Sequence, residues 1–363
     1  MKQWLETRQV FDTLAAWHTA GVRAALATVI RVNGSAYRHE GAKLVVAETE
    51  QHVGNVSGGC LEADVREVAQ RVLRTGIAEL RTYCGGSDEI TAWDLGVGCD
   101  GEVEILVEPV TSARLPERSA IASETAYVAV TLLRDASECG EAPRLVITSA
   151  GSFGTLGDIA LDTHVHVHAA AWRSGDASCI TTIGDARILV DVLTPPPRLI
   201  VVSAGDDARI LARLSSEVGF RVVVVDRRPG LLTRERFSSQ VTLVESDAAR
   251  LNERLVLEPS SFCVVMTHDF ADDTAYLRAL LRTPARYLGV LGPRQRTERI
   301  LSRLRTDGPV DESRIYGPVG LDIGTDGAEQ VALAVLAEML AVRSGRQPQS
   351  LRVRRAPIHA NGE

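Results

Sequence analysis

The second half of the chain alternates short apolar runs with amphipathic stretches, and this alternation restricts the fold more than any other feature of the sequence. Short apolar runs bounded by turn residues predict buried strands, and apolar residues repeated every three or four positions predict helices. The predicted strands are 199–202, 222–225, 241–244, 262–266 and 287–291, and the predicted helices are 207–218, 272–281, 295–304 and 328–342. Strands that alternate with helices predict a parallel sheet with right-handed crossovers. We therefore predict a Rossmann-like α/β domain.

A proline linker separates this half from the part before it. Three consecutive prolines follow Thr194, and they can continue neither a helix nor a central strand. Upstream, predicted strands at 22–32, 42–47 and 103–107 and a predicted helix at 61–73 indicate a mixed α+β domain, which is strand-rich from about 111. At roughly 150 residues per domain, the length suggests two to three domains. We predict an N-terminal domain of residues 1–195, a Rossmann-like domain of residues 196–345 and a tail of residues 346–363.

The first turn of the predicted Rossmann-like domain has the form of a nucleotide-binding turn. It reads S-A-G-D-D-A from Ser203, where a dinucleotide fingerprint has G-x-G-x-x-G/A. Gly205 would let the backbone approach a phosphate at a helix N-terminus, and Asp226 stands where a ribose-binding carboxylate would lie. Ser203 replaces the first glycine, and two aspartates after Gly205 add negative charge. The sequence therefore leaves binding of NAD(P) or another nucleotide open.

A cysteine follows two glycines in the segment V-S-G-G-C-L-E, where a helix is predicted to begin. Gly58 and Gly59 free the backbone to turn sharply and to approach a ligand. A helix N-terminus stabilises a thiolate, so Cys60 could bind a soft metal or carry sulfur. Ser57 and Glu62 are alternatively plain helix-capping residues.

Three further groups are suited to an anionic or sulfur-ligated ligand, each with a simpler alternative. Gly98 and Cys99 lie in the loop L-G-V-G-C-D-G, which is alternatively a glycine-rich turn with an inert thiol. Arg38 and Lys43 lie in a polar loop that could hold an anion, or that is simply a solvated hairpin loop. Arg294 follows a Gly-Pro pair before a predicted helix, where it could meet a phosphate or lie on a solvated helix face.

Three histidines alternate in the segment H-V-H-V-H. We predict that His164, His166 and His168 share one face of a strand. Their spacing could suit a metal ion, but an exposed strand face is the simpler explanation. The sequence has no CxxC pair, Walker A motif, H-E-x-x-H motif or G-x-S-x-G elbow. A zinc ribbon and the common hydrolase types are therefore not indicated.

Charge and hydropathy argue against two classes of partner, nucleic acid and the membrane. The formal net charge is −7, from 40 basic and 47 acidic residues, whereas nucleic-acid-binding domains are usually strongly basic. No apolar run approaches the ~20 residues of a membrane helix, and the N-terminus lacks the apolar core of a signal peptide. We expect a cytoplasmic protein whose main partner is neither nucleic acid nor a membrane.

The loops and the C-terminal α/β half together resemble the XdhC/CoxI family. The N-terminal strings that carry the resemblance are G-S at 34–35, G-A-K at 41–43, V-S-G-G-C-L-E at 56–62 and L-G-V-G-C at 95–99. The C-terminal strings are M-T-H-D at 266–269, Y-L-G-V-L-G-P-R at 287–294 and G-P-V-G-L-D-I-G at 317–324. The chain departs from the family at two places: the first Rossmann turn usually reads G-A-G-H-D-A, and the second cysteine loop often ends C-G-G.

The resemblance implies an accessory protein that binds molybdenum cofactor (molybdopterin), supports its sulfuration and inserts it into a xanthine dehydrogenase-type molybdenum hydroxylase. The implied partners are the apo molybdenum hydroxylase and a cysteine desulfurase, and a homodimer is left open. The candidate cofactor-binding residues are Ser57, Gly58, Gly59, Cys60, Gly98, Cys99, Arg38, Lys43, Gly205, Asp226 and Arg294, with Cys60 and Cys99 as candidate molybdenum contacts.

Two other functions remain in competition with this one. The first is an NAD(P)-dependent oxidoreductase that uses the Rossmann half, although no catalytic acid beside a substrate pocket is evident. The second is an interaction scaffold without bound cofactor. We favour a non-enzymatic chaperone for cofactor insertion.

Overall fold

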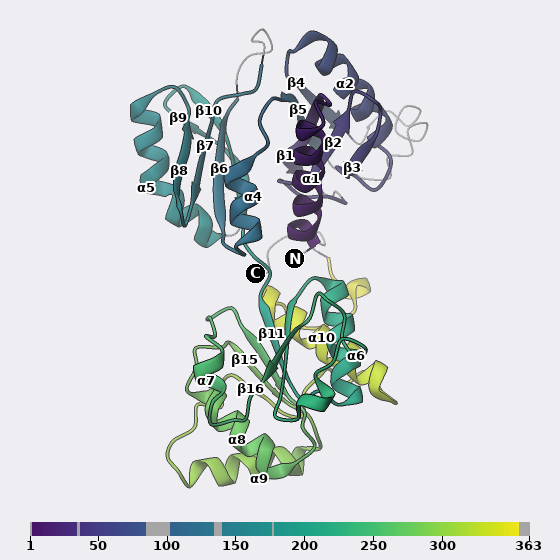
Figure 1. Ribbon diagram of the computed structural model, residues 1–363, viewed down its shortest axis with the longest axis vertical. Helices are drawn as coiled ribbons and strands as arrows, with labels where there is room; N and C mark the ends of the chain where they lie inside the picture. The colour runs from purple at the N-terminus through teal and green to yellow at the C-terminus, as the bar shows by residue number, and fades with distance from the viewer. Residues whose placement is uncertain (1, 35–36, 85–101, 134–139, 176–177, 356–363) are drawn as a thin grey trace. The chain divides into compact units, whose positions relative to one another are not determined.

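The computed structural model describes residues 2–34, 37–84, 102–133, 140–175 and 178–355 of the chain. The chain divides into two compact units, Lys2–Pro195 and Pro196–Arg354 (Figure 1). The predicted loop with Gly98 and Cys99 lies outside the described residues. None of the helices in the described ranges has the length and apolar content needed to cross a membrane.

The C-terminal unit is a six-stranded parallel sheet with helices on both faces (Figure 1). Its strands are β11 (Arg198–Val202), β12 (Arg221–Asp226), β13 (Thr242–Glu245), β14 (Phe262–Val265), β15 (Tyr287–Val290) and β16 (Ile315–Tyr316). Its helices are α6 (Asp206–Val218), α7 (Leu251–Arg254), α8 (Phe270–Leu281), α9 (Arg294–Arg305) and α10 (Ala328–Ser344). The strand order β13-β12-β11-β14-β15-β16 is that of a Rossmann fold. The predicted fold class is confirmed.

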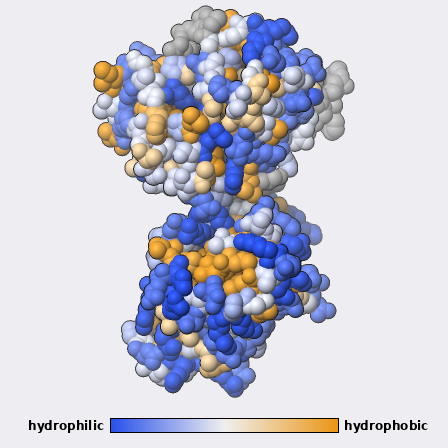
Figure 2. Space-filling model, viewed as in Figure 1, coloured by the Kyte–Doolittle hydropathy of each residue, from blue (hydrophilic) through white to orange (hydrophobic). Residues whose placement is uncertain are grey.

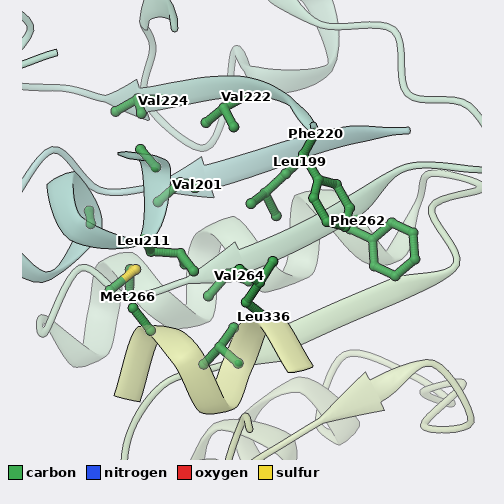
Figure 3. Packing of buried hydrophobic residues seen from close by; sticks show 14 of the residues in the cluster. Leu199, Val201, Leu211, Phe220, Val222, Val224, Phe262, Val264, Met266 and Leu336 are labelled. Atoms are coloured by element: carbon green, nitrogen blue, oxygen red, sulfur yellow. The ribbon is translucent and has the colours of Figure 1, made fainter. Parts of the chain in front are cut away.

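Two hydrophobic cores hold this sheet, one on each face. Successive side chains of a strand point to opposite faces, and in a parallel sheet both faces are covered. Leu199 and Val201 therefore lie on one face with Leu211 of α6 and Leu336 of α10 (Figure 3). The residues between them in the sequence pack on the opposite face, where α7, α8 and α9 contribute Leu251, Leu277 and Ile300. On the face of this unit that Figure 2 shows, most of the surface is hydrophilic, and hydrophobic residues (orange) gather in one area.

The N-terminal unit contains two antiparallel sheets. The first has the order β3-β2-β1-β5-β4, with β1 (Ala24–Asn33), β2 (Lys43–Ala47), β3 (His52–Gly54), β4 (Glu79–Cys84) and β5 (Glu102–Val110). The second has the order β8-β7-β6-β10-β9, with β6 (Tyr127–Leu132), β7 (Arg144–Thr148), β8 (Gly151–Thr155), β9 (Cys179–Ile183) and β10 (Ala186–Leu193). The described helices are α1 (Lys2–Thr19), α2 (Glu62–Thr75), α4 (Leu115–Ala122) and α5 (Ile159–Gly175). This mixed architecture agrees with the predicted α+β class.

Helix α2 covers the first sheet. Its residues Val65, Val68 and Val72 are buried and pack on a core that β1, β2 and β5 share. The helix ends at Gly76, which has a left-handed backbone with φ of 70°, as glycine does at many helix C-termini. This packing fixes the start of α2, and with it the loop that carries the candidate thiol.

The predicted strand through the three histidines is wrong, because this segment is part of helix α5. Leu161, Val165 and Ala169 recur every four residues and are buried, which is a helical period. The alternating H-V-H-V-H pattern suggested a strand only because its window was too short to show this longer repeat. The rings of His164 and His168, one turn apart, stack at 4.0 Å. No group of metal-binding side chains was found in the described parts of the chain.

Candidate functional site

The loop between β3 and α2 is organised around the hydroxyl of Ser57. Ser57 Oγ donates a hydrogen bond to Glu62 Oε2 at 2.5 Å and accepts hydrogen bonds from the amides of Gly59 and Leu61, both at 3.1 Å. Ser57 itself is buried. The hydroxyl therefore satisfies two amides of the loop before α2, whose N-cap residue is Leu61.

The carboxylate of Glu62 completes this network. It accepts hydrogen bonds from the amides of Ser57 at 2.8 Å and Val56 at 3.2 Å, in addition to the Ser57 hydroxyl. Partial burial by itself would raise the pKa of Glu62, but hydrogen bonds from the Ser57 side chain and from backbone amides outweigh it and lower the pKa below its ordinary value. Glu62 is therefore ionised at neutral pH and holds the loop closed on itself.

Cys60 lies on this loop with a half-buried, free thiol. Its Sγ is 3.6 Å from Ser57 Oγ. At the neighbouring Gly59, φ is 114°, and no atom of the residues that the structure describes lies within 4 Å of the position that a Cβ would occupy. The amides of Gly58 and Cys60 donate no hydrogen bond to any residue in the described ranges. Among the described residues, nothing blocks the approach of a ligand to the backbone at Gly59, whereas the side chain of Cys60 packs in part against the core that α2 covers.

The predicted anion-binding residues Lys43 and Arg38 both have acidic partners. Lys43 is buried at the start of β2, and its Nζ donates hydrogen bonds to Asp191 Oδ2 and Gly41 O, each at 2.8 Å. Burial lowers the pKa of Lys43, and the charge of Asp191 opposes this effect. Arg38 forms an ion pair with Glu6 of α1. The solvated loop considered for Lys43 is wrong, and the role of both residues toward a phosphate stays a prediction.

The Rossmann turn uses the carboxylate of Asp226 internally. Asp226 Oδ2 accepts a hydrogen bond from the amide of Ala204 at 2.7 Å, and Oδ1 accepts from the amide and Nε of Arg228 at 2.9 and 3.0 Å. Partial burial would raise the pKa of Asp226, but the Arg228 side chain and the backbone amides lower it. Gly205 caps α6 next to this turn, and Ser203 has a φ of 153°. Asp226 therefore ties the end of β12 to the turn.

The two aspartates at the start of α6 have side-chain partners within the same unit. Arg236 donates to Asp206 at 3.0 Å, and His268 Nε2 lies 3.2 Å from Asp207 Oδ2. His268 has a φ of 64°, which is uncommon for a residue other than glycine. Arg294 begins α9 with an exposed side chain. These contacts show how the two aspartates are accommodated, but they leave a nucleotide at this turn untested.

Of the predicted residues, the structure brings Ser57, Gly58, Gly59 and Cys60 together on one loop, and Gly205 and Asp226 together at one turn. The sequence did not indicate that the ring of Tyr37 lies against Gly58. The only sequence signal was the position of this exposed tyrosine in the polar loop before β2. Among the remaining cysteines, Cys263 is buried in β14, and burial raises the pKa of its thiol.

The chain combines two units. One is a Rossmann unit, and the other is an antiparallel unit in which a cysteine follows two glycines just before a helix. This combination defines the class of protein. A model described as the XdhC Rossmann domain matches residues 199–339, and a model described as the XdhC and CoxI family matches residues 17–84. A Bacillus subtilis protein, described as one of the probable subunits of a xanthine dehydrogenase, is 30% identical over 88% of this chain and 93% of its own length. The chain belongs to the XdhC and CoxI family, and the predicted resemblance is confirmed.

Two further relatives extend over nearly the whole chain. A solved structure of a xanthine dehydrogenase from Bacillus halodurans has a TM-score of 0.76 and 28% identity, and the match covers 94% of this chain and 97% of that one. An Escherichia coli protein described as "Molybdenum cofactor insertion chaperone PaoD" is 24% identical over 91% of this chain and 87% of its own length.

Proposed function

We propose that this protein binds molybdenum cofactor, supports its sulfuration and inserts it into a molybdenum hydroxylase of the xanthine dehydrogenase type. The names of its relatives support this class of function. The observation that carries the proposal is the half-buried thiol of Cys60, presented by a glycine pair on a loop that Ser57 and Glu62 hold in place. A thiolate is a soft ligand that suits a sulfur-ligated metal, and free backbone amides suit its anionic groups.

The partners are those that the resemblance to the XdhC/CoxI family implies. We propose that a cysteine desulfurase, as the source of sulfur for the cofactor, and the apo-hydroxylase both bind this chain. Cys60 is the described residue that can contact the metal or accept sulfur, and Cys99 is proposed to act with it. Arg38 and Lys43, both of the N-terminal unit, are proposed to offer positive charge to the phosphate.

The first prediction concerns the thiol of Cys60. The protein purified under nitrogen with molybdenum cofactor should carry molybdenum and pterin in equal amounts. The Cys60→Ala variant should bind the cofactor at least about tenfold more weakly, because a direct soft ligand to the metal is lost. Metal and pterin analysis after gel filtration measures this effect.

Cys179 provides the matched control, because its thiol is also half-buried and free but lies on β9. The Cys179→Ala variant should bind the cofactor as the unaltered protein does. Equal binding by the Cys60→Ala, Cys99→Ala and unaltered proteins would show that neither thiol holds the cofactor.

The alternative of an NAD(P)-dependent oxidoreductase has the Rossmann fold in its favour. The internal hydrogen bonds of Asp226 weigh against it, because both carboxylate oxygens already have partners. Titration with NAD(H) and NADP(H) distinguishes the two functions, since micromolar affinity with turnover would support the enzyme. A scaffold without cofactor would retain neither molybdenum nor pterin after purification.

A further inference from the structure

The side chain of Tyr37 lies near Gly58, the first glycine of the Cys60 loop. Its Cγ is 3.5 Å from the position that a Cβ on Gly58 would occupy, and its Cβ and Cδ1 are 3.7 Å from it. The side chain of Tyr37 therefore lies beside Gly58, on the side toward which a Cβ of that residue would point.

The rest of the Tyr37 side chain faces solvent. Tyr37 is 64% exposed, whereas Tyr127, Tyr276 and Tyr287 are buried. No hydrogen bond joins its hydroxyl to any residue that the structure describes. Exposure of an aromatic ring leaves apolar surface in water, and burying that surface under a ligand is favourable. Tyr37 therefore presents an aromatic surface that nothing in the described chain covers.

Three kinds of binding group belong to this one short segment. The aromatic ring of Tyr37 lies beside Gly58, the backbone of Gly59 comes next, and the half-buried thiol of Cys60 follows it. The free amides of Gly58 and Cys60 supply hydrogen-bond donors. A flat ring fits the first group, and an anionic, sulfur-bearing or metal-bearing end fits the others.

We propose that Tyr37 is a stacking platform for the flat heterocycle of the ligand whose metal or sulfur end lies at Cys60. This inference rests on the proposed function, and it adds a residue that recognises the organic part of the cofactor. An aromatic ring stacks on heterocycles through its π-face, and such contacts change affinity by about tenfold or more when the ring is removed. The phenol oxygen is not needed for stacking, so phenylalanine should replace tyrosine.

The test uses the full-length protein and two probes, a bare pterin without metal, dithiolene or phosphate, and intact molybdenum cofactor released anaerobically from a purified hydroxylase. Quenching of pterin fluorescence measures the affinity for the bare pterin, and isothermal titration under nitrogen measures the affinity for the intact cofactor. The Tyr37→Ala variant should bind both probes about tenfold more weakly, and the Tyr37→Phe variant should bind them as the unaltered protein does. The Cys60→Ala variant should lose more affinity for the intact cofactor than for the bare pterin.

Phe153→Ala is the matched control, because Phe153 is also an exposed aromatic residue, at 41%, and lies on strand β8. It should leave both affinities unchanged, and thermal unfolding confirms that each variant is folded. If Tyr37→Ala binds both probes normally, or if the unaltered protein binds the intact cofactor but not the bare pterin, the stacking role is wrong. If Tyr37→Ala binds the cofactor normally but no longer activates the apo-hydroxylase, Tyr37 is a contact for that protein and the inference also fails.

The proposed function fails in a different way. In that case the unaltered protein binds neither probe, and no comparison between variants of Tyr37 is needed to see it. Failure of the proposed function is therefore recognised from the unaltered protein, whereas failure of the stacking role alone leaves binding of the intact cofactor by the unaltered protein in place.

Discussion

At the scale of single residues, hydrogen bonds to one carboxylate hold the candidate site together. Glu62 accepts three hydrogen bonds, two from the backbone amides of Val56 and Ser57 and one from the hydroxyl of Ser57. The sequence offered helix capping as the simpler explanation for Ser57 and Glu62, but the N-cap residue of α2 is Leu61, and no side chain caps the helix there. The hydrogen bonds of Ser57 and Glu62 instead order the loop before α2, which carries the thiol of Cys60.

The lowered pKa of Glu62 gives a prediction about stability and pH. A carboxyl group whose pKa is lower in the folded state stabilises the fold fully above its unfolded pKa, near 4.5, and loses this contribution as the pH falls through the folded pKa. The Glu62→Gln variant should therefore be less stable than the unaltered protein at pH 7. The difference should shrink as the pH falls below about 4.5, and urea unfolding at several pH values measures it.

Glu67→Gln is a suitable control on the same helix, because Glu67 is exposed and lies outside the Ser57 network. It should show little loss of stability at pH 7. A stability difference for Glu62→Gln that stays constant between pH 7 and pH 3.5 would contradict the assignment of these hydrogen bonds to an ionised carboxylate.

At the scale of helices and strands, long or strongly apolar segments could be predicted from the sequence. The Rossmann strands are continuous runs such as Leu199 to Val202, and their alternation with helices predicted a parallel sheet. It did not predict that β11 lies between β12 and β14. Helix α5 was missed because histidine and valine alternate in its middle, and only Leu161, Val165 and Ala169 reveal the helical period. Local apolar patterns therefore predict many of the helices and strands. The prediction fails where a short alternation of polar and apolar residues hides a longer helical repeat.

The partner of Lys43 could not be predicted, because it comes from a distant part of the chain. Lys43 lies on β2 and Asp191 on β10, 148 residues away, so their ion pair joins the two sheets of the N-terminal unit. Both side chains are 2% exposed. A buried ion pair needs both partners, since one charge left alone in the interior is costly.

The Lys43→Met variant should therefore destabilise the N-terminal unit by about 3 kcal/mol, because it leaves the charge of Asp191 with only its weaker contacts. Those contacts are Ser178 Oγ at 3.2 Å and Arg144 at 3.9 Å. Chemical unfolding measures the loss, and an additional Asp191→Asn change should recover part of it. If Lys43→Met is as stable as the unaltered protein but binds molybdenum cofactor weakly, Lys43 acts on the ligand and not between the sheets.

At the scale of the whole molecule, the chain contains two compact units with separate cores and different sheet types. Matches to two different family models, at residues 17–84 and 199–339, follow this division. The thiol, the glycine pair and the aromatic ring all belong to the N-terminal unit. In the C-terminal unit, Asp226 and the aspartates of the Rossmann turn already have partners within that unit.

These assignments predict that cofactor binding belongs to the N-terminal unit. A fragment of residues 2–195, expressed alone, should fold, because compact units with their own cores can do so. It should bind intact molybdenum cofactor within about tenfold of the full chain, because the direct contacts we propose at Cys60 and Tyr37 are retained, whereas residues 196–355 alone should not. Isothermal titration under nitrogen measures both affinities, and circular dichroism verifies folding. Binding only by the full chain, with both fragments folded, would mean that the Rossmann unit supplies a direct ligand, and Gly205 and Arg294 would then be the first residues to change.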